Sequence, residues 1–435
     1  MLLSVAFGGL YAAYSVRQHH RLETHGFDLG IFEQVVRGYA SGGAPVVDLK
    51  GPGVNALGDH FHPIVALLAV AYRLVPQAET LLVAQAVLIA VSVAVVGRAA
   101  WAVAGPAGGA SVTVAYGLSW GLQETVAFDF HEVSFAVPLL ALALTRLLDE
   151  RWTAAVAWAA PLVLVKEDLP LTVAAIGGYL VLRGQRRLGT AVVLGGVLSA
   201  AVIVGIVMPA IAAGHGYAYV DQIGRVEHGL GIATKLDTLL LVLVPTLFVA
   251  LRSPLLLVAV PTLGWRFLAD NPNYWGDQFH YSAPLMPIVF VALLDGLRRC
   301  DGPPIRTAIP AWCLAFALAL APTRPLWRLT EPALWRDDPA SAAVVDALRR
   351  VPDGATVAAT NAVAVQLTGR CRVTLLGAVP PDRERAEWVA ADLPGRASFL
   401  SPHQLANHLA GLRAAGYRDV VAGAHVVILR RQQYG

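Results

Sequence analysis

Acidic and histidine side chains recur at separate points of this otherwise apolar sequence. The first are Asp28 and Glu33 in the stretch THGFDLGIFEQ, followed by Asp59, His60 and His62 in GDHFHP. Carboxylate oxygens and imidazole nitrogens are hard and borderline metal ligands, and in proteins such groups also transfer protons. Their spacing does not match a helix-borne zinc signature such as HExxH, so the pattern leaves the choice of chemistry open.

Three further polar clusters follow. They are Asp129, His131 and Glu132 in FDFHE; Lys166, Glu167 and Asp168 in KEDLP; and Trp275, His280 and Tyr281 in NYWGDQFHYS, with Arg225 in the intervening stretch GYAYVDQIGRVEHG. Three charges at the centre of a bilayer would cost about 7 to 10 kcal/mol. The charges at 166–168 therefore indicate an outer helix junction or the wall of an aqueous cavity. A solvated turn with an internal lysine–carboxylate pair is the simpler alternative.

The elements that must position these groups are membrane helices. Hydrophobic residues make up 56% of the 435 residues and charged residues only 14%, and the mean hydropathy is +0.58. So little polar surface excludes a soluble globular protein. The net charge of +3 gives no indication of nucleic-acid binding, and the three cysteines lack the spacing of a disulfide framework or a thiolate metal site.

About eleven apolar runs approach the length that a bilayer core of roughly 30 Å requires. They lie near residues 1–16, 79–97, 110–124, 133–148, 153–165, 169–183, 188–208, 237–251, 254–268, 280–297 and 306–321. The short connections at 98, 146–151, 183–187, 252 and 298–306 are rich in arginine. By the positive-inside rule these connections are cytoplasmic, and the polar clusters lie on the outer face.

The first outer loop extends from about residue 17 to 78. His62-Pro63 opens an apolar stretch that ends before Pro76 and is too short to span a membrane comfortably. If it crossed, it would invert every later loop against the arginine pattern. We therefore expect a helix lying in the membrane interface.

The chain is expected to divide into a transmembrane domain, residues 1–321, and a small α/β domain, residues 322–435. The second part predicts a helix near 341–350, a turn at 352–354 and strands near 355–360 and 371–376 with a helix between them. A third strand at 386–393, a helix at 403–416 and a strand-like end at 419–431 are expected to follow. The predicted topology places this domain outside the cell. No GxGxxG fingerprint follows its first strand, so nucleotide binding is poorly supported.

Acid and histidine on several loops of one membrane face suggest a shared cavity for a polar substrate. Here the segments THGFDLGIF, LGDHFHPIVALLAVAYRLVPQAETLLVAQAVLI, FDFHE, KEDLP and HYSAPLMPI resemble a bacterial and archaeal family of predicted membrane proteins. That family in turn resembles the GT-C glycosyltransferases. The resemblance runs over most of the chain, including the outer domain.

The GT-C resemblance implies a multi-pass enzyme of the cytoplasmic membrane that transfers a sugar from a polyprenyl-phosphate donor. The acceptor would be a cell-envelope glycan, lipid or protein on the outer side. The resemblance assigns Asp28, the acid after the first helix, as general base, with Glu33 a poorer candidate.

The remaining candidates would bind the substrate. The phosphate is expected to bind to Lys166, Arg225, His60 and His131. The sugar or isoprenoid is expected to stack on Trp275 and Tyr281, and the substrate-binding set also includes Glu167, Asp168 and His280.

Three alternatives stay open at this point. A divalent metal, Mg²⁺ or Mn²⁺, could be held by Asp59, His62, Asp129 and Glu132. A transporter or flippase would also place ionisable groups in a membrane domain, although no internal repeat relates two halves of the chain. The outer domain could instead be a binding or assembly module on an inactive membrane anchor.

Overall fold

The computed structural model describes residues 1–212, 227–300, 302–393, 395–396 and 398–432. The chain forms two compact units. The helical unit comprises Met1–Ala12, Leu57–Ile64 and Ala84–Thr330, and the mixed unit comprises Ala13–Ala56, Val65–Val83 and Glu331–Gly435. The predicted first outer loop is thus divided between the two units, and the domain bounds expected from the sequence stay a prediction.

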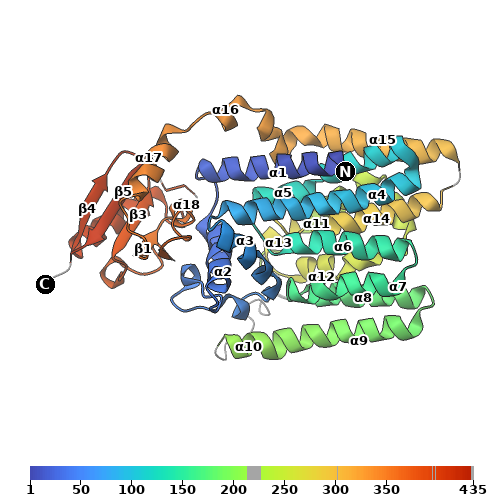
Figure 1. Ribbon diagram of the computed structural model, residues 1–435, viewed down its shortest axis with the longest axis horizontal. Coiled ribbons are helices and arrows are strands. Elements are labelled where there is room, and N and C mark those ends of the chain that lie inside the picture. Colours follow the sequence, from blue (N-terminus) through green and yellow to red (C-terminus); the bar gives the residue numbers. More distant parts are fainter. Residues whose placement is uncertain (213–226, 301, 394, 397, 433–435) are drawn as a thin grey trace. The chain divides into compact units, whose positions relative to one another are not determined.

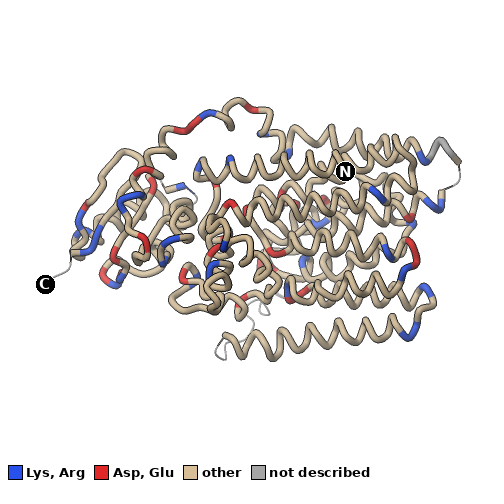
Figure 2. The backbone as a smooth tube through the Cα atoms, viewed as in Figure 1, with Lys and Arg blue, Asp and Glu red and all other residues tan. Residues whose placement is uncertain are grey.

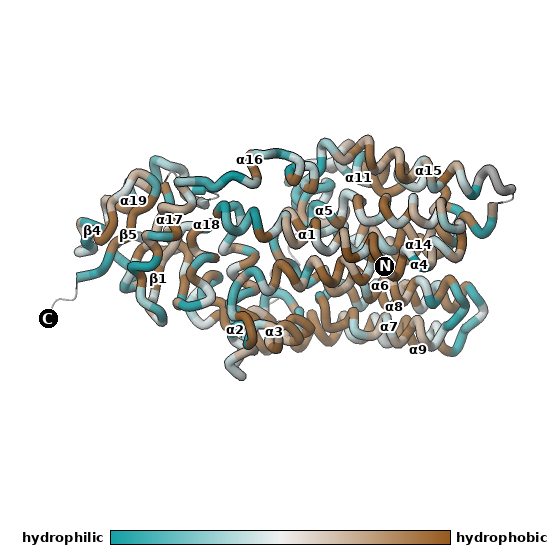
Figure 3. Tube along the Cα trace, turned by 45° about the horizontal axis from the view of Figure 1, so that its top comes forward, coloured by the Kyte–Doolittle hydropathy of each residue, from teal (hydrophilic) through white to brown (hydrophobic). Residues whose placement is uncertain are grey.

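Apolar helices make up the helical unit (Figures 1 and 3). They are α5 (Trp120–Ala127), α6 (Val133–Leu148), α7 (Trp152–Ala159), α8 (Leu169–Leu182), α9 (Arg186–Val202), α10 (Met208–Ile211), α11 (Ile232–Leu243), α12 (Val260–Leu268), α13 (Pro272–Trp275), α14 (Leu285–Arg298) and α15 (Pro303–Leu320). Two more, α1 (Leu2–His20) and α4 (Glu79–Gly117), have residues in both units. A break at Gly105, with φ 69° and Pro106 following, divides α4 where the sequence predicts two separate runs.

Helices α8 and α9 pack with their backbones almost in contact. A Cβ atom on Gly177 would lie 2.6 Å from the backbone nitrogen of Val193, and one on Gly189 would lie 2.7 Å from the backbone oxygen of Gly177. Small residues allow this close approach, which is a common way for helices to associate in membranes. The charged residues of the KEDLP segment lie directly before the first residue of α8.

Basic residues gather at one end of the helical unit. Figure 2 shows them at the connections α6–α7, α8–α9 and α14–α15. In the described part of the chain, three helical segments are long and apolar enough to cross a membrane: Glu79–Ala127, Arg186–Ile211 and Arg306–Thr323. Shorter apolar helices include Pro63–Leu74, where an interfacial helix is expected. The number of crossings and the sidedness therefore stay predictions.

The mixed unit contains a five-stranded sheet of order β2-β1-β3-β5-β4. Its strands are β1 (Thr356–Ala359), β2 (Arg372–Leu375), β3 (Trp388–Asp392), β4 (Tyr417–Ala422) and β5 (Val426–Arg431). The first three are parallel, and β5 is antiparallel to both β3 and β4. The predicted strands at 355–360, 371–376 and 386–393 are confirmed. The predicted strand-like end is instead a hairpin, because a turn at 423–425 interrupts the pattern.

Helices α17 (Pro339–Leu348), α18 (Asn361–Ala364) and α19 (Pro402–Ala414) accompany the sheet. Helix α19 begins with a capping box in which Ser401 and Gln404 bond reciprocally to each other's backbone. Its buried face, Leu405, Leu409 and Leu412, packs into the same core as Val389 and Leu429. The first outer loop adds η1 (Gly26–Gly30), α2 (Ile31–Ala40), η2 (Asp48–Lys50) and α3 (Leu68–Leu74) to this unit.

Cysteine labelling tests the predicted sidedness. The three native cysteines are buried, so a new cysteine will dominate the labelling. We expect a membrane-impermeant maleimide to label His403→Cys, on α19, in intact cells, and to label Gln185→Cys, between α8 and α9, only after permeabilisation. The reverse pattern would contradict the predicted topology.

Candidate functional site

The connections of the helical unit bring several predicted site residues together. We define the polar cluster as His60, His131, Glu132, Lys166, Glu167, Asp168 and His280. They come from the 57–64 segment and from the connections α5–α6, α7–α8 and α13–α14. Contacts between His60 and Glu167, between Glu132 and Lys166, and between His131 and His280 join these connections. Arg225 lies outside the described residues.

A lysine–carboxylate pair links two of these connections. The Nζ atom of Lys166 lies 3.0 Å from Oε1 of Glu132, and both side chains are almost completely buried. Burial by itself raises the pKa of the Glu132 carboxyl, but the Lys166 ammonium and the neighbouring imidazoles lower it to about 2. Burial likewise opposes the charge on Lys166, yet the nearby carboxylates, Glu132 first, hold its pKa above the usual value. Both groups are therefore charged at neutral pH.

Glu167 holds His60 in a fixed orientation. Its Oε1 accepts from Nδ1 of His60 at 2.7 Å, and its Oε2 accepts from the backbone N–H of Phe61 at 3.0 Å. Although burial opposes ionisation, His60 keeps the pKa of Glu167 below its usual range. With Nδ1 donating to the carboxylate, the second ring nitrogen of His60 is the one directed away from the pair. Such carboxylate–imidazole pairs orient proton-transferring histidines.

Asp168 completes the KEDLP turn. Its Oδ2 accepts from the indole N–H of Trp265 at 2.8 Å, and burial raises its pKa to about 6. Pro170 lies in the first turn of α8, where its missing N–H costs nothing. The helix therefore starts directly after the three charged residues, which keeps all of them in the connection.

Two stacked imidazoles form the next part of the cluster. The rings of His131 and His280 lie 3.8 Å apart between centroids, and Phe128 stacks on His131 at 5.2 Å. Within the described chain, Nδ1 of His280 has no hydrogen-bond partner. Burial and neighbouring positive groups lower the pKa of His280. A neutral, buried imidazole beside charged side chains is a candidate for contact with a polar ligand.

The backbone around this stack is strained. Asp129 has φ 61° and Phe279 has φ 67°, values that are uncommon outside glycine and, for a bulky side chain such as Phe279, a clear outlier. Gln85 of α4 holds the Asp129 turn, since its amide donates to the Asp129 carbonyl at 2.7 Å and accepts from the His131 N–H at 3.1 Å. Strained backbone of this kind persists only where surrounding contacts enforce it, and it is frequent at functional sites.

Arg266 holds the connection that carries His280, a role that was not predicted from the sequence. Its guanidinium is fully buried and donates to the carbonyls of Tyr274 and Gly276 at 2.8 and 2.7 Å and to the Ser282 hydroxyl at 3.0 Å. These bonds fasten the α13–α14 connection that carries His280. Arg266 lies inside a predicted apolar run, so only its presence as a lone arginine there could have signalled a role.

The two aromatic candidates differ in their surroundings. The ring of Tyr281 lies 4.2 Å from His280 between centroids, so it belongs beside the cluster. The indole of Trp275 is buried, donates to the Ala269 carbonyl at 2.7 Å and is covered by the ammonium of Lys235 at 4.2 Å. A stacking role for Trp275 remains a prediction, and it would require Lys235 to be displaced.

The two predicted catalytic acids belong to the mixed unit. Asp28 lies in the single turn η1 and is partly exposed. Glu33 lies on α2, fully buried, where it accepts hydrogen bonds from the hydroxyls of Tyr72, at 2.9 Å, and Thr368. Burial raises the pKa of Glu33 to about 7, and the two hydroxyl donors only partly offset it.

The four candidate metal ligands do not assemble into a set. In the described part of the chain, no three of Asp59, His62, Asp129 and Glu132 present ligand atoms within 4.8 Å of one another. Glu132 is instead engaged with Lys166. A metal at these residues stays a prediction.

The model of the family described as "Predicted membrane protein (DUF2079)" matches residues 18–417. This chain belongs to the DUF2079 family. No curated protein has a significant sequence match to it.

The fold of this DUF2079 chain is similar to that of a solved glycosyltransferase. The crystal structure of ArnT from Cupriavidus metallidurans, bound to undecaprenyl phosphate, matches with a TM-score of 0.60 and 12% identity, over 98% of this chain and 97% of ArnT. ArnT has the GT-C fold. The predicted resemblance to both the family and the GT-C fold is thus confirmed, while identity this low shows the fold alone.

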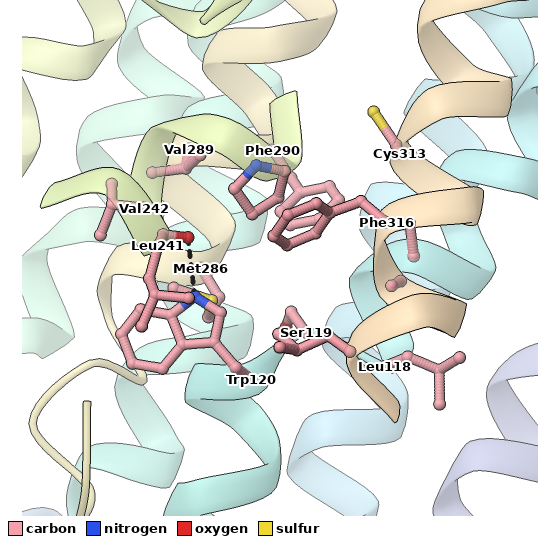
Figure 4. A pocket seen from close by; sticks show the side chains of 14 residues that line it. Leu118, Ser119, Trp120, Leu241, Val242, Met286, Val289, Phe290, Cys313 and Phe316 are labelled. Atoms are coloured by element: carbon pink, nitrogen blue, oxygen red, sulfur yellow. Dashed lines mark hydrogen bonds between the residues drawn. The ribbon is translucent and has the colours of Figure 1, made fainter. Parts of the chain in front are cut away.

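An apolar pocket, absent from the sequence predictions, lies inside the helical unit of this DUF2079 protein (Figure 4). Residues of α4, α5, α11, α14 and α15 and of the α4–α5 connection line it, including Leu118, Trp120, Met286, Phe290 and Phe316. The indole N–H of Trp120 donates to the Leu241 carbonyl at 2.9 Å, which ties α5 to α11 at the pocket wall. These residues are scattered along the sequence, so periodicity gave no signal for them.

Replacing Lys166 tests the electrostatics of the cluster. Lys166→Met would leave Glu132 and Glu167 buried without their cation, which we expect to cost about 3 to 5 kcal/mol. Glu132→Gln should cost less, because Lys166 keeps Glu167 and Asp168 as neighbours. The measurement is Tm in detergent. Lys235→Met, which loses a cation–π contact with Trp275 in the described part of the chain, is the control. Equal Tm values for Lys166→Met and Lys235→Met would show that Lys166 does not compensate buried carboxylates.

The buried Glu33 predicts a pH-dependent stability. Its folded pKa, about 7, exceeds the ordinary value of 4.5, so its protonation stabilises the folded state fully below pH 4.5. This contribution is lost as the pH rises through 7, by at most about 3 kcal/mol. Between pH 4.5 and 8 the Tm of the wild type should therefore fall further than that of Glu33→Gln. The exposed Glu387→Gln should follow the wild type, and identical pH profiles for all three would refute the assignment.

Proposed function

We propose that this protein transfers a sugar from a polyprenyl-phosphate donor to an acceptor at the outer face of the cytoplasmic membrane. The observation that carries the proposal is the fold match to ArnT, which extends over nearly the whole of both chains and concerns a structure bound to undecaprenyl phosphate. Membership of a family of predicted membrane proteins agrees with it.

The polar cluster offers the groups that this reaction requires. A sugar presents hydroxyls, which carboxylates bind, and a departing phosphate needs N–H donors and positive charge. Lys166 uses one of its three N–H donors on Glu132. Its remaining donors, with the imidazoles of His131 and His280, are proposed to meet the phosphate.

The apolar pocket supports the lipid part of the proposal. Its lining is almost entirely hydrocarbon, with Trp120, Phe290 and Phe316 as its largest side chains. The cavity volume is about 20 Å³, so side chains must move apart to admit an isoprenoid chain. Burial of such a chain against this lining is favourable by about 25 cal/mol per Å². We propose that part of the donor's lipid lies there.

In the proposed step, the acceptor hydroxyl oxygen attacks the anomeric carbon and forms the new glycosidic bond. The bond between that carbon and the phosphate oxygen breaks, and polyprenyl phosphate leaves with the bonding electrons. The Asp28 carboxylate takes the acceptor's proton. Glu33, with its raised pKa and two hydroxyl donors, is assigned a supporting role.

Removing the proposed base tests this function. Purified protein incubated with radiolabelled sugar–undecaprenyl phosphates and a panel of acceptors should release undecaprenyl phosphate. Asp28→Asn should lower the rate by about 10²- to 10⁴-fold, the usual contribution of a general base. Asp346→Asn, an acid 82% exposed on α17, should leave the rate unchanged.

Two results would reject the proposal. One is a folded wild-type protein that turns over none of the donors. The other is accumulation of a donor inside sealed vesicles without covalent change, which would favour the transporter alternative.

A further inference from the structure

The parallel part of the sheet has the topology of a ligand-binding fold. Strand β1 lies between β2 and β3, and its chain leaves through α18 towards β2 on one side. Open sheets of this kind bind ligands at the carboxyl ends of the strands where the connections diverge. Here that position lies between Thr360, after β1, and Asp392, at the end of β3.

The polar groups at this position are already bonded within the mixed unit. The Thr360 hydroxyl donates to Oδ1 of Asp392 at 2.5 Å and accepts from the Asp392 N–H at 3.2 Å. The other carboxylate oxygen, Oδ2, accepts from the Arg396 N–H at 2.7 Å. Both side chains are buried, so they stabilise the strand ends and do not await a ligand.

The chain's own η1 turn packs against α18 beside these strand ends. Oδ1 of Asn361, the first residue of α18, accepts from the Phe27 N–H at 2.7 Å. The approach of the two backbones is close: a Cβ atom on Gly26 would lie 2.6 Å from Cβ of Ala364 and 3.1 Å from the Asn361 carbonyl oxygen. Only glycine fits at position 26 without displacing α18.

Phe27 is held on its other sides as well. Its ring makes an edge contact with Phe399 at 5.5 Å between centroids, and the Lys50 ammonium lies 5.6 Å from it. Its backbone, at φ −86° and ψ 54°, departs from the helical values of the surrounding turn. The residue immediately before Asp28 is therefore fastened through both its backbone and its side chain.

The helix that follows Asp28 is fastened to the same part of the domain. On α2, the Arg37 guanidinium donates to the carbonyls of Thr368 and Cys371 at 2.9 and 2.6 Å. The Gln34 amide donates to the Val373 carbonyl, on β2, at 3.0 Å. Asp28 thus lies between two anchors, Phe27 before it and α2 after it, that both attach to residues 361–373.

We propose that the α/β domain is an internal scaffold that positions Asp28, with Asn361 as the principal positioning residue. The inference rests on the proposed function, because it takes Asp28 as the base. It replaces the idea of a separate binding module: the polar groups at the ends of β1 and β3 bond to each other, and the adjacent α18 holds the η1 turn.

Asn361→Leu tests this inference, since leucine is close in size but cannot accept from the Phe27 N–H. Deuterium exchange should become faster in peptides covering residues 24–30 and stay unchanged in β3. In the transfer assay kcat should fall about 10- to 100-fold, the effect of misplacing a catalytic group by about 1 Å, while KM for the donor stays the same. Asn407→Leu, at an exposed position of α19, should change neither.

A second variant guards against misfolding of the first. Gly26→Ala should give the same faster exchange and the same selective loss of kcat, and Gly43→Ala, where no atom lies closer than 3.6 Å to the added Cβ, should behave as the wild type.

Unchanged exchange in both Asn361→Leu and Gly26→Ala, or faster exchange with unaltered kcat, would overturn the inference. If the wild type shows no transfer at all, the proposed function fails, and the exchange data alone decide whether Asn361 anchors the turn.

Discussion

A buried lysine surrounded by carboxylates is the interaction on which the helical unit depends. Moving an ammonium group out of water costs several kcal/mol, and only close opposite charges and hydrogen bonds can offset that cost. Lys166 has this compensation from Glu132 at 3.0 Å, with Glu167 and Asp168 beside it in the chain. The connections α5–α6 and α7–α8 must therefore stay together, and the apolar helices that follow them, α6 and α8, are tied at the same end.

The same constraint explains why the cluster is a network and not a set of isolated side chains. Glu167, adjacent to Lys166, is bonded by His60 and by the Phe61 N–H, and Asp168 is bonded by Trp265. Each bond ties a further segment of the chain to the KEDLP turn. Within the described chain, Nδ1 of His280 and Oδ1 of Asp168 are buried without a hydrogen-bond partner. A polar ligand that entered here could bond to these atoms, because unpaired polar groups are costly in an apolar surrounding.

Much of this arrangement could be predicted because charge in a membrane protein is expensive. The cost at 166–168 limited those residues to a helix junction or a cavity wall, and the structure has them in the connection between α7 and α8. The assignment of the loops to two membrane faces from arginine and histidine stays a prediction. The strands β1, β2 and β3 were predicted from short, largely apolar runs bounded by turn or loop residues. In each case the physical cause acts on residues that are neighbours in the sequence, so a local pattern was enough for the prediction.

What could not be predicted depends on packing between segments that are distant in sequence. Gln85 and Arg266 lie inside apolar runs, and only the folded backbone shows that they hold the loops of His131 and His280. The four metal candidates suggested a site by residue type, yet side-chain geometry does not bring three of them together. The pairing of Glu33 with Thr368 joins residues more than three hundred positions apart, a separation at which a single sequence gives no signal.

The small sheet has a topology found in ligand-binding folds, but we propose a structural role for it. Its parallel strands and their order would favour a nucleotide-binding interpretation, but a fold does not by itself specify a ligand. The decisive evidence lies in the hydrogen bonds: Thr360 and Asp392 bond to each other, and Asn361 bonds to the chain before Asp28. Fixing the backbone of a loop costs about 1 to 2 kcal/mol of conformational entropy per residue. Several contacts are therefore needed to hold one carboxylate in place. The contacts of Gly26, Phe27, Gln34 and Arg37 with the domain are of the number and kind that such a task requires.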